Sequence, residues 1–149
     1  MRNAPATLLA LFWIASLAAG GERLSVEIVQ IEASGEGNVP NFDKPLSRFK
    51  DPLTKQGWKY SQYTFLRSEK KEGVVNEKLS FSCGNYGVVI TPKQVKPRKA
   101  TAELVLTKKG VSAPIQHLDT NLPYQVPLFL NMPEATKAQI IAIVAGPAE

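Results

Sequence analysis

Residues 79–90 read LSFSCGNYGVVI, and this stretch decides the class of fold. Its first half alternates apolar side chains with serines, which is the period of a β-strand with one buried face. The apolar positions are Leu79, Phe81 and Cys83. Gly84-Asn85 is a favoured pair for a tight hairpin turn, and the residues after it predict a return strand that ends at Pro92. The stretch therefore predicts an antiparallel hairpin.

The same period of two recurs along most of the chain. Further alternating or apolar segments lie at 24–33, 58–67, 101–107, 115–118, 124–130 and 138–145. Turn signals separate them, namely the charged run 68–73, the basic connector 93–99 and the polar triplet 119–121. Because residues 138–145 are apolar on both faces, we place them in the middle of a sheet. Seven or eight short strands at this spacing predict an antiparallel β-sandwich, immunoglobulin-like or related.

One short helix is expected near residues 43–56. Asp43 can cap the free backbone N–H groups at its start, and Pro45 is tolerated in a first turn. An apolar stripe follows at spacings of three and four: Leu46, Phe49 and Leu53. Pro52 removes a backbone donor within that stripe, so we expect a kink or a separate turn before Gly57. The helix would cover an open end or one face of the sandwich.

The N-terminus has the build of a secretory signal peptide. A basic start at Arg2 precedes an uncharged apolar run at 4–19, and small residues close it. The run is shorter than the ~20 residues of a bilayer-spanning helix. We expect residues 1–20 to be cleaved after Gly20, with cleavage after Ala18 as the second choice and an uncleaved anchor as the alternative. Residues 21–149 would then form a single β-sandwich domain with no stable transmembrane span.

Composition narrows the compartment and the partners. The net charge of +5 over 149 residues is modest, and together with export it argues against nucleic acid as a partner. The single cysteine, Cys83, allows no internal disulfide, and the sequence contains no N-x-S/T glycosylation acceptor. Small secreted domains of multicellular organisms usually carry several disulfides. We therefore expect a bacterial protein that is periplasmic or secreted.

The sequence motifs that could support catalysis or the binding of a metal or nucleotide are weak. Cys83, His117 and Asp119 could supply a nucleophile, a base and an orienting carboxylate. Cys83, however, continues the apolar face of its strand, where a free cysteine behaves as a small hydrophobe.

One cysteine and one histidine cannot complete a closed zinc site, and no nucleotide-binding glycine motif is present. One group of oxygen-bearing residues lacks the repeated acidic spacing of a calcium loop: Glu32, Glu36, Asn38, Asn41 and Asp43. We expect no cofactor and no metal.

Two surface features are candidate binding sites. The first is a basic patch that forms if two turns lie at the same end of the sheet: Lys93, Lys96, Arg98, Lys99, Lys108 and Lys109. Such a patch could meet an anionic surface, whereas lysines that only protect edge strands are the alternative. The second is the segment 122–133, LPYQVPLFLNMP, whose prolines confine it to a sheet edge. Its apolar residues could pair with another chain. The alternative is that one face packs into the core and the helix covers the rest. These residues are Tyr124, Val126, Leu128, Phe129 and Leu130.

These observations favour an exported, non-catalytic binding or assembly module of the bacterial cell envelope or the secreted milieu. Its partner would be an unknown protein or an anionic envelope component, engaged through the basic patch, the apolar edge strand or both. A cysteine-dependent hydrolase or transferase that uses Cys83 with His117 is the second hypothesis. A carrier of a small apolar ligand is the third.

Overall fold

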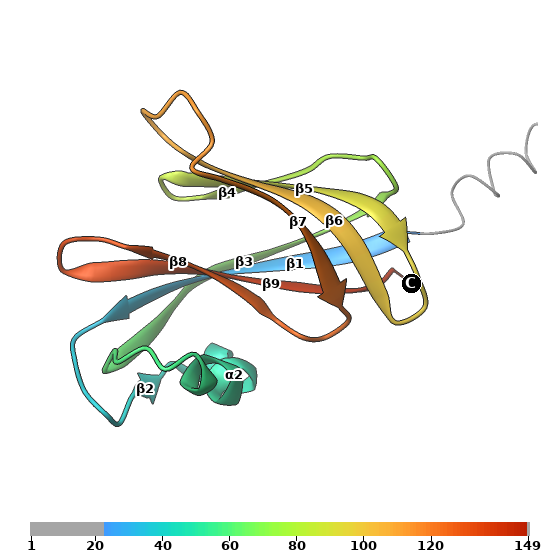
Figure 1. Cartoon of the computed structure of the whole chain (residues 1–149). Helices are drawn as coiled ribbons and strands as arrows, with labels where there is room; N and C mark the ends of the chain where they lie inside the picture. Colours follow the sequence, from blue (N-terminus) through green and yellow to red (C-terminus); the bar gives the residue numbers. More distant parts are fainter. Residues whose placement is uncertain (1–22, 149) are drawn as a thin grey trace, which may run out of the picture.

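The computed structural model describes residues 23–148, which form two β-sheets packed face to face and a helical layer on the outside of one sheet (Figure 1). The expected β-sandwich is confirmed. The predicted signal peptide, residues 1–20, lies outside the described residues. Between residues 23 and 148, no helix has the length and apolar character needed to cross a membrane.

The first sheet has five strands in the order β2-β3-β1-β9-β8. Their bounds are Arg23–Ser34 for β1, Asn41–Phe42 for β2, Gln62–Val74 for β3, Leu128–Pro133 for β8 and Lys137–Pro147 for β9. The short β2 is parallel to β3, and the other neighbours are antiparallel. β9 lies between β1 and β8, so the central position predicted for residues 138–145 is confirmed.

The second sheet has four strands that follow one another in space as in sequence, β4-β5-β6-β7. Their bounds are Leu79–Cys83 for β4, Tyr86–Val95 for β5, Lys99–Lys108 for β6 and Gln116–Pro123 for β7. The predicted hairpin is present, with Cys83 opposite Tyr86 and Gly84 at φ +65° in the turn. Immunoglobulin domains connect their strands as a Greek key, so the likeness to them stops at the two packed layers.

The central strands of the first sheet, β1 and β9, are covered on both faces, which explains why both carry apolar residues on both faces. On β1, Val26 and Ile28 face the second sheet, whereas Val29 and Ile31 face the helical layer. All four side chains are at most 2% exposed. Burying one such side chain contributes about 1.5–3 kcal/mol relative to leaving it exposed. Hydrophobic burial on two sides therefore selects this order of layers.

The helical layer consists of a 3-10 helix, η1 (Lys44–Phe49), that continues into α2 (Lys50–Lys55). The predicted stripe of Leu46, Phe49 and Leu53 is buried against the first sheet, which confirms the helix and its buried face. The position of the irregularity differs from the expectation. Pro52 lies in the first turn of α2, where its missing N–H is tolerated, and the change of helix type comes before it.

Asp43 also differs from its expected role. It occupies the N-cap position of η1, but its side chain makes no capping hydrogen bond. Its Oδ2 instead accepts a hydrogen bond from the backbone N–H of Phe65 at 2.9 Å, and its Oδ1 accepts one from Gln62 at 3.4 Å. The carboxylate therefore anchors the start of the helical layer to β3.

Two expected turns belong to strands, and a third, the basic connector 93–99, is shortened to residues 96–98. The charged run 68–73 lies within β3, because residues 24–29 of β1 pair along it. Within this run, the ammonium of Lys71 lies 5.3 Å from the ring centre of Phe81. β5 continues past Pro92 to Val95 through a bulge between Pro92 and Gln94, where a proline is tolerated. The triplet 119–121 pairs along β6, so β7 is unbroken from Gln116 to Pro123.

Candidate functional site

β8 is an edge strand of the first sheet, as predicted for part of the segment 122–133. Its direction of hydrogen bonding follows from the turn after it, where Glu134 N–H donates to the carbonyl of Lys137 at 2.7 Å. In an antiparallel pair this direction alternates along the strand. Phe129 and Asn131 therefore direct their backbone N–H and C=O groups away from β9, toward the open edge.

The residues of β8 are uncharged, which sets this edge apart from two others. β7 carries His117 and Asp119, and charge on an edge strand discourages pairing with other chains. At β4, Lys71 of β3 donates a hydrogen bond to the carbonyl of Ser80 at 2.5 Å and so covers the edge. β8 is bounded by prolines at 127 and 133, which limit the outward donors to the two residues between them.

The other predicted edge residues have separate positions. Tyr124 and Val126 lie in the connection from β7 to β8, where the chain passes from one sheet to the other. Tyr124 Oη donates to the carbonyl of Lys96 at 2.5 Å, and Tyr124 N–H donates to the carbonyl of Arg98 at 3.1 Å. The side chain of Val126 is 54% exposed. Leu128 and Leu130 face the core between the sheets, whereas Phe129 faces the helical layer.

The basic residues form two groups instead of one patch. Lys93, Lys96, Arg98 and Lys99 lie around the turn between β5 and β6, and Lys108 and Lys109 lie at the other end of β6. Nine residues of a strand span about 30 Å, so the two groups are at opposite ends of the second sheet. The prediction that they meet depended on two turns sharing one end, and the antiparallel meander separates them.

Cys83 and His117 are also far apart. They lie on the two outer strands of the second sheet, β4 and β7, which are separated by about 14 Å at the usual spacing between strands. Cys83 is 3% exposed and faces the core, and burial raises the pKa of its thiol. His117 is exposed and its Nε2 lies 2.9 Å from Glu103 Oε2, which lowers the pKa of that carboxyl. Asp119 is exposed on the same strand as His117.

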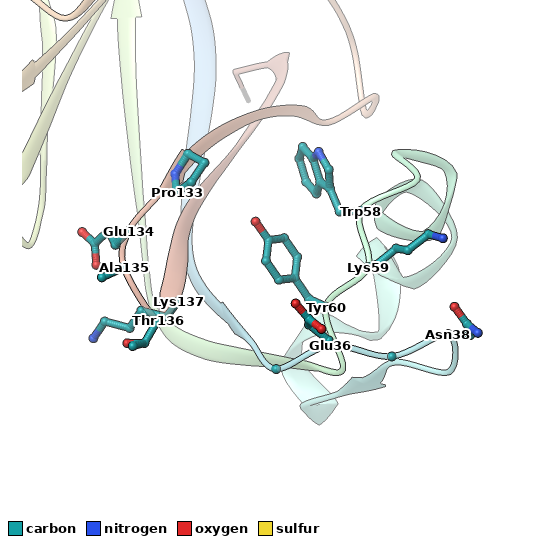
Figure 2. A pocket seen from close by; sticks show the side chains of 12 residues that line it. Glu36, Asn38, Trp58, Lys59, Tyr60, Pro133, Glu134, Ala135, Thr136 and Lys137 are labelled. Carbon is teal, nitrogen blue, oxygen red and sulfur yellow. The ribbon is translucent and has the colours of Figure 1, made fainter.

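A groove lies at the end of the first sheet, on the side of the helical layer, with a volume of about 800 Å³ (Figure 2). Three segments line it: 35–38 after β1, 58–60 before β3, and the turn 133–137 between β8 and β9. The rings of Trp58 and Tyr60 project into it, with centres 6.5 Å apart and planes at 59°. Pro133 and Thr136 border the opposite side.

Packing and hydrogen bonds hold the walls of the groove. Trp58 packs edge-on against Phe129 of β8 at 6.3 Å, and Tyr60 packs edge-on against the buried Tyr63 at 6.0 Å. Gly37 N–H donates to the carbonyl of Lys59 at 3.3 Å and joins the first two segments. Gly35 has φ +73°, and a Cβ there would lie 2.0 Å from Ser61 Oγ, so the close approach of these segments requires glycine.

The oxygen-bearing residues considered for calcium serve separate purposes. Glu32 pairs with Lys137 at 3.1 Å and Asp43 holds β3, whereas Glu36 and Asn38 border the groove. Across residues 23–148, no three His, Cys, Asp or Glu side chains are grouped so that they could hold a metal ion.

Sequence reasoning missed Trp58 and Tyr60, which it treated as the start of a strand. The signal that could have identified them is an aromatic pair two residues apart. It comes directly after Gly57, before the strand pattern becomes regular. Comparison of the chain with known protein families, with curated proteins and with solved structures found no match.

Proposed function

We propose that this protein is an exported, non-catalytic binding module that pairs an extended segment of a partner protein with the edge of β8. The observation that carries the proposal is an uncharged edge strand with two residues, Phe129 and Asn131, whose backbone groups point outward. Strand addition of this kind gains affinity from main-chain hydrogen bonds and specificity from alternate side chains. The side chain of Asn131 has a further unsatisfied group at this strand, because its Oδ1 is buried and has no hydrogen-bond partner among the described residues.

The division of the basic residues favours the β8 edge over the basic patch as the main contact. The geometry around Cys83 likewise favours binding over cysteine chemistry, because a thiolate nucleophile needs a nearby base and a lowered pKa. A carrier of an apolar ligand needs an empty interior, and side chains from both sheets fill the space between them here.

Asn131→Pro tests the pairing proposal. The substitution removes an outward N–H without removing a donor to β9, so we expect the variant to fold and to retain about tenfold less partner protein. The measurement is affinity capture from an extract of cells that carry the gene, with wild type and variant as baits and quantitative mass spectrometry of the captured proteins.

Asn121→Pro on β7 is the matched control. Asn121 also lies two residues before a proline on an edge strand. Tyr124 N–H donates to the carbonyl of Arg98 on the side of β6, and because this direction alternates along the strand, the N–H of Asn121 points to the open side. We expect this variant to capture the same proteins as the wild type. Equal loss in both variants, or equal capture by Asn131→Pro and wild type, contradicts pairing at β8.

Export is part of the same proposal and is tested by the mass of the processed protein. When the full-length gene is expressed in a bacterium, we expect soluble protein outside the cytoplasm that begins at Gly21, or at Ala19 for the second cleavage choice. Intact-mass measurement of the periplasmic and medium fractions decides between them. Protein that keeps Met1 and stays in the membrane fraction would instead support the uncleaved anchor.

A further inference from the structure

We propose that the groove beside Trp58 and Tyr60 binds a neutral carbohydrate. Its volume of about 800 Å³ lies within the range of small-ligand sites, roughly 300–1,000 Å³. The site differs from the open edge of β8, because it lies at the end of the sheet and neither Phe129 nor Asn131 lines it. The inference therefore goes beyond the pairing proposal and does not depend on it.

The aromatic side chains are the first reason. A pyranose ring has an apolar face of C–H groups that packs flat on an indole or phenol ring, while its hydroxyl groups point outward from the ring edge. Trp58 and Tyr60 are each partly exposed in the groove, and their planes differ by 59°. Two tilted rings can contact two faces of one sugar unit or two successive units of a chain. Their edge-on packing on Phe129 and Tyr63 fixes the ring positions before any ligand binds.

The polar groups are the second reason. Asn38 supplies an amide donor and acceptor, Glu36 an acceptor and Thr136 a hydroxyl that does both. Within residues 23–148, none of these three side chains makes a hydrogen bond to another residue. A sugar hydroxyl both donates and accepts, so a mixed set of this kind matches it better than a row of donors or of acceptors would.

Charge decides between neutral and anionic ligands. The groove is lined by two carboxylates, Glu36 and Glu134, and two ammonium groups, Lys59 and Lys137. Glu134 lies 3.3 Å from the hydroxyl of Tyr86, and Lys137 is paired with Glu32. The hydrogen bond from Tyr86 leaves Glu134 charged, so the three carboxylates Glu32, Glu36 and Glu134 outnumber the two ammonium groups, and a phosphate or a uronate gains no net attraction. Two rings with centres 6.5 Å apart do not enclose a cation on several sides, as an aromatic cage does.

The position of Trp58 makes the test direct. The sequence contains two tryptophans, Trp13 and Trp58, so the full chain with Trp13→Phe reports on the groove alone. Neutral hexasaccharides of glucose, N-acetylglucosamine, mannose and xylose are titrated while Trp58 fluorescence is recorded. We expect a saturable change with at least one of them. An α-linked hexagalacturonate and a decaproline peptide serve as anionic and peptide probes.

Variants measured by calorimetry complete the test. We expect Trp58→Ala to weaken binding of that sugar by about tenfold or more through lost ring contact, and Asn38→Ala by about three- to tenfold. Asn85→Ala, an exposed turn asparagine at the β4–β5 hairpin, is the matched control and should bind as the wild type does. Unchanged fluorescence with all four sugars overturns the inference. So does binding that only the galacturonate or the peptide shows, or sugar binding that Trp58→Ala leaves intact.

Discussion

Leu53→Ala is expected to lower the free energy of unfolding by about 2–5 kcal/mol. Leu53 is the last residue of the buried stripe, with an exposed fraction of 0%, and it packs with Phe49 and Leu46 on the outer face of the first sheet. Truncation would lose the transfer free energy of the removed isopropyl group and leave a cavity. Urea denaturation followed by circular dichroism measures the loss.

The control is the same substitution at an exposed position. Leu66 on β3 is 41% exposed, so Leu66→Ala should change the free energy of unfolding by less than about 1 kcal/mol. If the helical layer folds together with the sandwich, Leu53→Ala lowers the midpoint and leaves the slope of the transition unchanged. Equal effects of the two substitutions would show that the helical layer adds nothing to the stability of the sheets.

Alkylation of native Cys83 at neutral pH is expected to be at least ~100-fold slower than alkylation of the unfolded chain. The thiol is 3% exposed within the core, and burial raises its pKa, so both access and the thiolate fraction are low. The rate with iodoacetamide, followed by intact-mass spectrometry with and without urea, is the measurement. Fast labelling of the native protein would contradict this expectation and support the hypothesis of a cysteine-dependent hydrolase or transferase.

A shift of the thiol by one residue provides the matched control. Ser82 is the exposed neighbour on the opposite face of β4, so the double variant Ser82→Cys, Cys83→Ser should be labelled at nearly the unfolded rate.

The raised pKa of Cys83 also makes the stability of the protein depend on pH. The folded state disfavours the thiolate, so stability is full below the ordinary thiol pKa and decreases as the pH rises through the higher folded value. Cys83→Ser should lack that decrease.

Local pattern predicted the elements whose burial is regular. The hairpin at 79–90, the central strand at 138–145 and the stripe of the helix were each predicted correctly, because the period of apolar residues reports directly which faces are buried. Turn signals were less reliable. The triplet 119–121 consists of residues that favour turns, yet pairing with all of its β6 partners outweighs that local preference.

The charged run 68–73 shows the same effect at a longer range. Its residues favour solvent, but β1 provides pairing partners along the whole run, such as Glu27 opposite Lys70. The long side chains can cover the gap between the sheets with their aliphatic parts, as Lys71 does over Phe81, and keep their charges in water. Such a strand carries no alternating pattern, so the sequence could not predict it.

The candidate sites divide in the same way. The sequence by itself determined the class of fold, the apolar edge segment and the weakness of the catalytic motif, because each depends on composition or on neighbours along the chain. The tertiary structure alone decided that the basic residues lie at two ends of a sheet and that residues 35–38, 58–60 and 133–137 meet in one groove. Strand order brings distant segments together, and side-chain periodicity reports which face of a strand is buried but not which strand lies beside it.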